Sequence, residues 1–472
     1  MPVTESLGSL SYSRAISGID YEYWYLQSTN NIPFYDIDFD NASNMYVLSN
    51  TPSSVVMYRF KEYNDYPYTI INGSGYVHRS LGPGGTYVSD NVNPKRIRYN
   101  GFLDKIFQVG YERNRQQTVF PYNFTWPATA TEYPTDLVLP TVPTTFVYAR
   151  YGAIGSGSTA AQYSDVDCSD SNGITYVTGY VDISGTLSQA FIKKYDSGLT
   201  TTIPPTDPYS QFAQSNNGGV ISNLDWSSSV KILSTSVVTG HNFSSSLSAR
   251  EVLITNFNPA PVLSGSNYYM ATNWQRKLTS TLYLEIVKLD KDISDNIYVT
   301  LKDTNSNISY VVKYNSSGAI QWQRRIVNVT LSDIVVETGG DFYIIGTNTS
   351  NNLFVAKYNA SGAIQWQNKV TGLTFTTQSI KIDSGNLYLC GTASSNGFVM
   401  KVPPSGSIPG DGTYNLVAGG TIVYSVATQT EAIGTLTDAA GSSSVFAGNE
   451  SLRDMVPQAS NNPGTFPATN LE

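Results

Sequence analysis

Two histidines, His78 and His241, are the only imidazole groups in this chain of 472 residues, so acid–base chemistry has few candidate residues. They lie far apart in the sequence, and no Gly-x-Ser-x-Gly elbow or His-Glu-x-x-His helix accompanies them. The glycines of Leu81-Gly-Pro-Gly-Gly-Thr86 lack the Lys-Ser/Thr pair that would hold a nucleotide, and they indicate a turn. The sequence therefore predicts no catalytic residue, no cofactor and no enzyme activity.

The acidic run Asp36-Ile-Asp38-Phe-Asp40-Asn41 is the strongest candidate for a metal site. A calcium loop needs Gly at its sixth position and a bidentate Glu at its twelfth, where this chain has Asn41 and Val47. Acidic residues also recur five or six residues before an aromatic one, at Asp40, Asp170, Asp292, Glu337 and Asp383. This regularity favours turn capping by the carboxylates, with calcium as the alternative at the first run, and we predict no metal.

Glycoside cleavage would need two carboxyl groups about 5–9 Å apart in a groove. Asp104, Glu112 and Glu132 are less regular and lie in or beside the stretch 111–145, but nothing singles them out.

Two long aromatic stretches, 61–92 and 111–145, are the best candidates for a binding surface. Long structured loops on a rigid scaffold usually carry function, and aromatic rings stack on sugars or anchor protein neighbours. The alternative is that the rings only pack the loops onto the scaffold. A third stretch, 200–222, contains Ile203-Pro-Pro and is interpreted as a rigid connector. The candidate binding residues are Tyr63, Tyr66, Tyr68, Tyr76, Tyr122, Phe124, Trp126 and Tyr133.

The scaffold itself is predicted from a repeat of 44 residues. Val-Val-Lys-Tyr-Asn-Ser-Ser-Gly-Ala-Ile-Gln-Trp-Gln at 311–323 returns as Val-Ala-Lys-Tyr-Asn-Ala-Ser-Gly-Ala-Ile-Gln-Trp-Gln at 355–367. A period in the low forties, with short β-rich runs between Gly/Asn/Ser turns, is typical of propeller blades. We therefore predict an all-β fold.

Two markers count the blades. One is an aromatic residue in a strand after a turn, often with Gly three residues later, and the other is a cation followed by a large apolar residue. The first occurs at Tyr46, Phe107, Tyr176, Val237 (with Gly240, in place of an aromatic), Tyr298, Tyr343 and Tyr388. The second occurs at Arg59-Phe60, Arg150-Tyr151, Lys194-Tyr195, Asn256-Phe257 (degenerate), Lys313-Tyr314, Lys357-Tyr358 and Lys401-Val402. Seven of each predict a seven-bladed β-propeller, with six or eight blades as alternatives.

Closure of the ring is predicted to use the N-terminus. Trp322 and Trp366 precede the next marker tyrosine by 21 and 22 residues, and Trp24 precedes Tyr46 by 22, although no complete blade lies before it. The last repeat has Pro409 instead of Gln-Trp, and proline cannot donate to a strand ladder. We expect a strand around Tyr21–Tyr25 to complete the last blade. The alternative is that Trp24 is only a core aromatic.

Composition excludes several classes of protein. A net charge of −8, a pI near 4.9 and only 14% charged residues argue against a nucleic-acid-binding surface. The N-terminus lacks the pattern of a signal peptide, and no stretch has the length and apolarity of a membrane span, so membrane insertion is not expected. Cys168 and Cys390 occupy different blades and predict no disulfide. The composition is nevertheless rich in Ser, Thr, Asn and Tyr and poor in Lys and Glu, as in proteins that function outside a cell. Release by cell lysis would explain an extracellular protein without a signal-peptide pattern.

Residues 411–472 break the repeat and are rich in Gly, Ala, Ser, Thr and Asn, with apolar islands at Tyr414–Val417 and Thr421–Val426. Such a segment is too polar to form a core alone. We predict a low-complexity arm that adds a strand to a neighbouring protein. The alternatives are a disordered tail and a tail folded against its own propeller.

The repeat phrase Lys-Tyr-Asn-x-Ser-Gly-Ala-Ile-Gln-Trp-Gln resembles bacterial β-propeller repeats of large secreted proteins. It also resembles propeller-like structural proteins of tailed phages that infect marine cyanobacteria. The match is clear over about 285–410, and Ala432-Ile-Gly-Thr-Leu-Thr-Asp-Ala-Ala-Gly-Ser-Ser-Ser444 is similar to a phrase of those virion proteins. The resemblance implies a location in the virion, in the tail, and no reaction.

The sequence therefore predicts an N-terminal extension (1–14), a propeller (15–410) and a C-terminal arm (411–472). The leading functional hypothesis is a structural tail protein of a virion that binds other virion proteins and copies of itself. One alternative is a host-recognition module that uses the aromatic loops on a surface polysaccharide. The other is a bacterial extracellular adhesin or lyase.

Overall fold

The computed structural model describes the chain in segments. The described residues are 6–7, 10–13, 24–28, 31–51, 54–63, 66–70, 89–116, 123–125, 128–134, 149–153, 160–182, 188–195, 210–214, 226–246, 249–264, 267–280, 283–407, 413–415, 421–429, 431–433, 436–440, 444–447 and 453–454. All regular elements among them are β-strands. No described helix could span a membrane.

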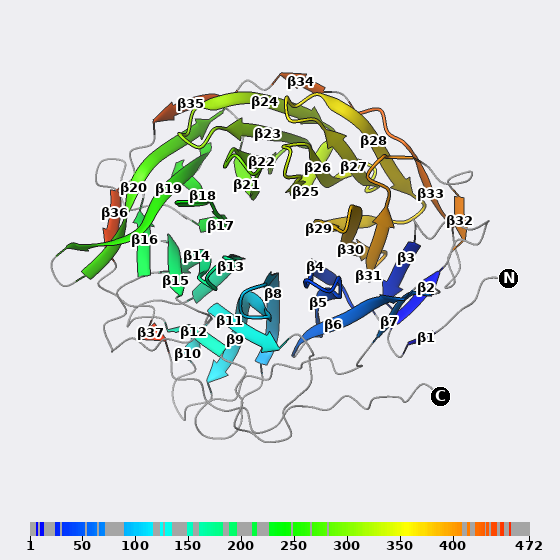
Figure 1. The fold of residues 1–472 in the computed structure, drawn as a ribbon, viewed down its shortest axis with the longest axis horizontal. Helices are drawn as coiled ribbons and strands as arrows, with labels where there is room; N and C mark the ends of the chain where they lie inside the picture. Colours follow the sequence, from blue (N-terminus) through cyan, green and yellow to red (C-terminus); the bar gives the residue numbers. More distant parts are fainter. Residues whose placement is uncertain are drawn as a thin grey trace.

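Seven antiparallel sheets form a closed ring, so the chain is a seven-bladed β-propeller (Figure 1). Blade 1 contains β4 (Phe34–Phe39), β5 (Met45–Thr51), β6 (Ser54–Tyr63) and β7 (Tyr66–Ile70). Blade 2 contains β8 (Ser89–Asn100), β9 (Lys105–Gln116), β11 (Ala128–Pro134) and β12 (Ala149–Ala153), with β10 (Asn123–Thr125) also paired to β9. Blade 3 contains β13 (Ala160–Cys168), β14 (Thr175–Asp182), β15 (Ser188–Tyr195) and β16 (Ser210–Gln214). The predicted fold class is confirmed.

The later blades repeat this order from the centre outward. Blade 4 contains β17 (Trp226–Ile232), β18 (Val237–Ser246), β19 (Ala249–Ser264) and β20 (Asn267–Thr279). Blade 5 contains β21 (Leu284–Lys291), β22 (Ile297–Asp303), β23 (Ile308–Tyr314) and β24 (Ile320–Val327). Blade 6 contains β25 (Val329–Val336), β26 (Phe342–Asn348), β27 (Leu353–Tyr358) and β28 (Ile364–Thr371). Blade 7 contains β29 (Phe375–Asp383), β30 (Asn386–Ala393), β31 (Asn396–Val402) and, from the N-terminus, β3 (Trp24–Ser28).

The N-terminal strand closes the ring. Strand β3 pairs antiparallel with β31, with Trp24 opposite Lys401, and so supplies the fourth strand of blade 7. The predicted closure is confirmed for Trp24 and Tyr25, while residues 21–23 lie outside the described residues. Strands β2 (Leu10–Ser13) and β1 (Ser6–Leu7) continue the same sheet outward, so part of the predicted N-terminal extension belongs to blade 7.

The C-terminal segment runs backward around the outer rim, where its strands are drawn in orange to red in Figure 1. We call strands β32–β37 the C-terminal belt. Its strands add to the outer edges of blades 6, 5, 4, 3 and 2 in that order. They are β32 (Thr413–Asn415) and β33 (Thr421–Val426) on blade 6, β34 (Glu431–Ile433) on blade 5, β35 (Thr437–Ala440) on blade 4, β36 (Ser444–Ala447) on blade 3 and β37 (Arg453–Asp454) on blade 2.

The prediction that this segment pairs with a neighbouring protein is therefore wrong for the described strands, which follow the alternative of folding against their own propeller. Strand edges of the same chain are available at a high effective concentration, which favours the intramolecular pairing. The apolar island at 421–426 takes part in the core, because Ile422 and Tyr424 are buried with Val370 and Leu387 between blades 6 and 7.

The two sequence markers form one local structure within a blade. Tyr298 of β22 lies opposite Lys313 of β23, whose ammonium lies 4.7 Å from the ring centroid and 3.6 Å from Asp292. Asp292 accepts hydrogen bonds from the backbone N–H groups of its own turn, as Asp40 does in blade 1. The interpretation of Asp40 and Asp292 as turn caps is confirmed.

Glycine after the marker aromatic is explained by a β-bulge in the innermost strand. A Cβ built on Gly346 would lie 2.5 Å from the carbonyl oxygen of Thr330, and one on Gly391 would lie 2.3 Å from that of Thr376. Contacts this short are forbidden, so the bulge selects glycine there. In blade 4 the register differs from the prediction by one residue: Val238 rather than Val237 is in the marker position opposite Lys231, and His241 is in the glycine position.

The predicted insertions contribute strands to their own blades. The stretch 61–92 includes β7, 111–145 includes β10 and β11, and 200–222 includes β16, so the last is not merely a connector. Because β11 of the stretch 111–145 is the third strand of blade 2, the residue opposite Phe107 in that strand is Glu132. Arg150-Tyr151, which we expected in that position, lies in the outer strand β12.

Tryptophan in the outer strand links three of the blades, 4, 5 and 6, to the blade that follows. The indole N–H groups of Trp274, Trp322 and Trp366 donate to the carbonyl oxygens of Ser316, Ala360 and Pro404, at 3.0, 3.2 and 3.0 Å. Each acceptor lies in the turn before the next blade's outer strand, or in the corresponding turn after β31. The Asn-x-Ser-Gly and Gln-Trp-Gln halves of the repeat therefore meet across blade boundaries.

Candidate functional site

The innermost strand of each blade carries a triplet in which an aliphatic residue separates two channel-facing positions. Because side chains alternate along a strand, the aliphatic residues enter the core between blades and their neighbours face the channel. All seven aliphatic residues are buried. The triplets are Asp36-Ile37-Asp38, Arg96-Ile97-Arg98, Asp165-Val166-Asp167, Ser229-Val230-Lys231, Lys288-Leu289-Asp290, Asp333-Ile334-Val335 and Ser379-Ile380-Lys381.

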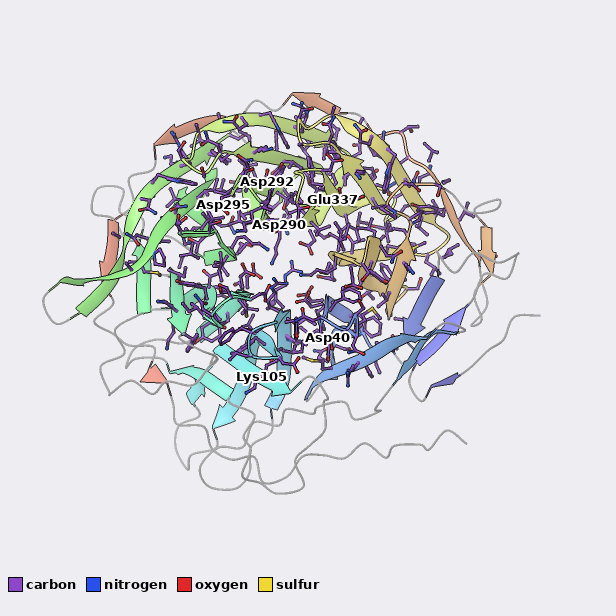
Figure 2. All side chains as sticks on the ribbon, viewed as in Figure 1. Asp40, Lys105, Asp290, Asp292, Asp295 and Glu337 are labelled. Carbon is purple, nitrogen blue, oxygen red and sulfur yellow. The ribbon has the colours of Figure 1, made fainter. Side chains whose placement is uncertain are left out.

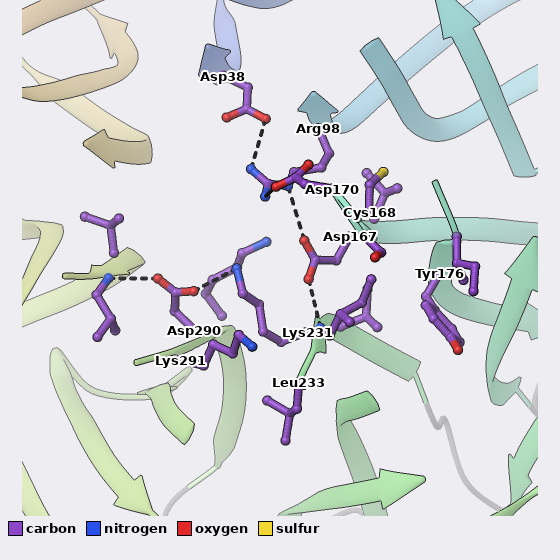
Figure 3. Close-up of a pocket in the computed structure, with 18 of the residues that line it drawn as sticks. Asp38, Arg98, Asp167, Cys168, Asp170, Tyr176, Lys231, Leu233, Asp290 and Lys291 are labelled. Carbon is purple, nitrogen blue, oxygen red and sulfur yellow. Dashed lines mark hydrogen bonds and ion pairs between the residues drawn. The ribbon is translucent and has the colours of Figure 1, made fainter. Parts of the chain in front are cut away.

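The third positions of the triplets form a ring of alternating charge, which we call the Asp38 ring. In blade order it consists of Asp38, Arg98, Asp167, Lys231, Asp290, Val335 and Lys381. Arg98 lies 3.5 Å from Asp38 and 3.2 Å from Asp167. Lys231 lies 2.8 Å from Asp290, and Figure 3 shows Arg98 between Asp38 and Asp167, with Asp290 and Lys231 in a separate group. Seven positions cannot alternate completely, and Val335 is the neutral member.

The first positions form a second layer, the Asp36 ring, in which two ion pairs join blades that are not neighbours and Arg96 also lies 3.6 Å from Asp36 of the neighbouring blade. It consists of Asp36, Arg96, Asp165, Ser229, Lys288, Asp333 and Ser379. Lys288 of blade 5 reaches Asp165 of blade 3 at 2.6 Å, and Arg96 of blade 2 lies 3.7 Å from Asp333 of blade 6. Side chains from the innermost strands project into the middle of the ring, as Figure 2 shows. These two ties obstruct passage through the channel.

Carboxylates in both rings also accept backbone N–H groups from the next blade. Asp38 accepts from Tyr99 at 2.7 Å, Asp167 from Ile232 at 2.8 Å and Asp290 from Val336 at 2.8 Å. The innermost strands are sheet edges with donors that no strand pairs, so these side chains satisfy groups that would otherwise be costly to bury. The acids therefore join neighbouring blades at the channel wall.

The electrostatic balance differs among these acids. Burial alone would raise the pKa of Asp38, but Lys381 and Arg98 hold this pKa below its usual value. Burial also acts to raise the pKa of Asp165, but Lys288 and Arg96 outweigh burial, so this pKa is lowered. Burial prevails at Asp36, whose pKa is raised. Carboxylates that keep a lowered pKa in a buried site are strongly paired.

A cavity of about 660 Å³ opens on the side of the Asp38 ring. Its wall includes the ring's charged residues, and the turn residues Ser169–Asn172 and Leu233–Ser236 also line it. Lys288 and Asp333 of the Asp36 ring belong to the lining as well. A second cavity of about 590 Å³ is lined by Lys95, Arg96, Glu285 and Lys302.

The residues first considered for catalysis do not come together in the described part of the chain. His241 is buried, its Nε2 lies 2.5 Å from the Thr239 hydroxyl, and burial lowers its pKa to about 3. Asp104 is exposed and accepts a hydrogen bond from the Tyr99 hydroxyl. Within the described residues no group of three His, Cys, Asp or Glu could hold a metal ion. His78 and the side chains of Glu112 and Glu132 lie outside the described residues.

Of the predicted aromatic binding residues, only the backbone positions of some are described. Tyr63 belongs to β6, Tyr66 and Tyr68 to β7, Phe124 to β10 and Tyr133 to β11. Tyr76, Tyr122 and Trp126, and the side chains of the others, lie outside the described residues. The two cysteines, Cys168 and Cys390, are buried free thiols, and burial raises the pKa of both.

The channel residues were missed by motif searching because no single residue type recurs at their positions. Their signal is positional: the Asp38-ring residue precedes the marker position by seven to nine residues in every blade. Aligning the blades on that position would have revealed the alternation of charge from one blade to the next.

No protein-family model and no curated protein matches this sequence. Among solved structures, an ulvan lyase of polysaccharide lyase family 25 is similar, with 12% identity, a TM-score of 0.47, and coverage of 78% of this chain and 91% of the lyase. Extracellular domains 1–2 of Drosophila semaphorin 1b align with 8% identity, a TM-score of 0.37, and coverage of 80% and 86%. Dipeptidyl peptidase 4 of Porphyromonas gingivalis aligns with 10% identity and a TM-score of 0.34, over 89% of this chain and 59% of that one. Similarity this low assigns no activity.

Proposed function

We propose that this chain is a non-enzymatic structural protein of a virion, a component of the tail of a tailed phage. Its partners would be other virion proteins and further copies of itself. The proposal begins from the resemblance carried by the repeat phrase at 311–323 and 355–367. It places the protein in a particle assembled in the host cytoplasm and released by lysis.

The structural observation that supports the proposal most is the C-terminal belt. An open sheet edge is a template for unwanted pairing, and the risk grows where many copies of one chain are crowded together. Here the outer edges of blades 2 to 6 are each paired with a belt strand of the same chain, and blade 7 extends outward through β2 and β1. A ring protected in this way suits a building block that contacts its neighbours through faces and loops rather than through strand edges.

The charged channel is consistent with a structural role. Its carboxylates bridge blades through backbone N–H groups and ion pairs, as Asp165 does with Val230 and Lys288. A general acid or nucleophile needs a carboxyl group that is accessible to substrate. The side chain of Asp165 is 1% exposed, and that of Asp38 is 6% exposed.

The test is to purify the particles from a lysate and find the chain. Mass spectrometry should detect it in the particle fraction at a fixed copy number, and cryo-electron microscopy should show propeller density at one position in the tail. Recovery of the chain only as a free protein, with none in the particles, would overturn the proposal.

A second candidate is recognition of a host surface polysaccharide. The two aromatic insertions belong to neighbouring blades, since 61–92 spans blades 1 and 2 and 111–145 lies within blade 2. Neighbouring loops can form one continuous surface. Pull-down of the full chain by host envelope polysaccharide, reduced when Trp126 and Tyr122 are replaced by Ala, would support it. Equal retention of the variant would contradict it.

A further inference from the structure

We propose that the cavity on the Asp38 ring binds an anionic group, a carboxylate or a sulfate, between Arg98, Lys231 and Lys381. These three cations come from blades 2, 4 and 7 and line the same cavity of about 660 Å³. A volume of this size accommodates a monosaccharide or a small organic acid. The site is separate from the aromatic insertions and does not depend on the proposed virion role.

Among the members of the Asp38 ring, the groups that remain accessible in the cavity are mainly donors. Asp170 of a turn also lines the cavity, with its side chain 61% exposed, and lies 3.9 Å from Arg98. The side chains of Arg98, Lys231 and Lys381 are 27%, 23% and 22% exposed. Those of Asp38, Asp167 and Asp290 are 6%, 7% and 12% exposed, and each accepts a backbone N–H of the next blade. The ring's acids face the wall while its cations reach into the space, so a ligand between the three cations meets N–H groups.

Lys381 is the least neutralised cation of the ring. Its ring neighbours are Val335 on one side and Asp38 on the other, because alternation fails at the one neutral position. Its ammonium lies 3.8 Å from Asp38, whereas Lys231 lies 2.8 Å from Asp290. An ammonium has three N–H donors, and this geometry leaves Lys381 able to bind a further oxygen.

The three cations also act on one another. The positive charge of Arg98 opposes protonation of both Lys231 and Lys381, although burial opposes it more and nearby carboxylates keep the pKa of each lysine raised. An anion placed among the three would relieve this repulsion and accept from several donors at once, and Arg98 offers a planar fork that matches a carboxylate or sulfate.

The ligand enters from one side only. The Asp36 ring lies beneath, and its ties between Lys288 and Asp165 and between Arg96 and Asp333 obstruct the channel. A continuous polyanion could not thread through, so the occupant is a free anion or the end group of an acidic sugar.

The test is isothermal titration calorimetry of the full chain at low salt with sodium glucuronate, sodium sulfate and glucose. Glucuronate or sulfate should bind, more weakly as salt increases, and glucose should not. Binding by both anions would indicate any oxyanion group. Binding by sulfate alone would identify a free ion as the ligand, and binding by glucuronate alone would identify a sugar acid.

Lys381→Gln should weaken anion binding by at least about tenfold, since a charge-assisted contact is lost. Val335→Asp should also weaken anion binding by about tenfold while keeping every cation, because it places a carboxylate beside Lys381 in the ring. Lys302→Gln, in the second cavity, is the matched control and should bind normally. Circular dichroism confirms folding. Unchanged affinity in both cavity variants, or no binding of either anion by the unmodified chain, would overturn the proposal.

Discussion

Single carboxylates in this molecule hold blades together, and Asp165 shows how. It accepts the Ser229 hydroxyl at 2.7 Å and the Val230 N–H at 3.1 Å, and Lys288 meets it from blade 5. One side chain therefore links blades 3, 4 and 5. Removing one partner of a buried ion pair typically costs about 3–5 kcal/mol, because the other charge is left uncompensated.

The same carboxylates predict how stability depends on pH. The pKa values of Asp38, Asp165 and Asp290 are lowered in the folded protein, where cations outweigh burial. Their stabilisation is therefore present above the unfolded pKa of about 3.9 and is lost as the pH falls through the folded values. Asp36, with its raised pKa, acts in the opposite direction. We expect urea denaturation to show a steep loss of stability below about pH 4.

Asp165→Asn should lower stability at pH 7 and make its decline below pH 4 shallower, because one of the carboxylates that must be protonated is gone. Asp104→Asn is the matched control: this side chain is exposed, and Asn tolerates the positive φ of 51° there. An equally steep acid decline in the Asp165 variant would show that other groups set the pH dependence.

At the scale of elements, the belt is held by the last glutamine of the Gln-Trp-Gln motif. The side-chain amide of Gln323 donates to the Leu436 carbonyl at 2.9 Å and accepts the Leu436 N–H at 2.9 Å. Gln367 does the same with Gln429, at 3.4 and 3.1 Å. These side-chain amides provide the hydrogen bonds that a neighbouring strand would otherwise provide, at the points where the belt passes from one blade to the next.

We predict that Gln323→Ala lowers stability by about 1–3 kcal/mol, because two backbone groups of the belt lose their partners. Gln321→Ala in the same motif is the control, since Gln321 is exposed and bonds only to the carbonyl of its own turn at Ala319 among the described contacts. Hydrogen exchange at Leu436 should accelerate in the first variant alone. Equal exchange in the two variants would contradict the role of the Gln323 amide in holding the belt.

How far the elements could be predicted follows from how strictly each one repeats. Blades 5 to 7 were predicted well because the Tyr–Lys pair, the Asn/Asp turn and the tryptophan recur at fixed spacing. Blade 4 was displaced by one residue because Val238 and His241 replace the aromatic and the glycine. Trp274-Gln-Arg, a further copy of the tryptophan that bonds to the next blade, was overlooked because the turn and strand before it differ. Folding of the tail against its own propeller was considered only as an alternative, and the partner of each belt strand was not predicted, since strands of two to six residues carry too little alternation to reveal their partners.

At the scale of the whole molecule, the two chain ends have different tasks. The N-terminal strand β3 is the fourth strand of blade 7 and joins the first part of the chain to the last blade. The belt strands are fifth strands added to blades that are already complete. Loss of β3 would open the ring, whereas loss of the belt would uncover outer edges and a few buried side chains.

We therefore predict opposite outcomes for two truncations. Removal of residues 1–28 should leave β31 without its outer partner, so the chain should fail to give a folded monomer and should aggregate through the open edge. Removal of residues 411–472 should leave a folded ring of lower stability, since the stabilisation from burying Ile422, Tyr424 and Leu436 is removed, about 1.5–3 kcal/mol for each large apolar side chain.

Circular dichroism, thermal unfolding and light scattering after gel filtration would separate the two outcomes. The belt truncation should keep its near-ultraviolet signal, unfold at a lower temperature than the full chain and associate more readily at high concentration, because five blades regain open edges. Complete unfolding of the belt truncation would instead make the belt an integral part of the ring. The four-stranded blades would then be too weak to stand alone, and folding would have to wait for the last residues of the chain.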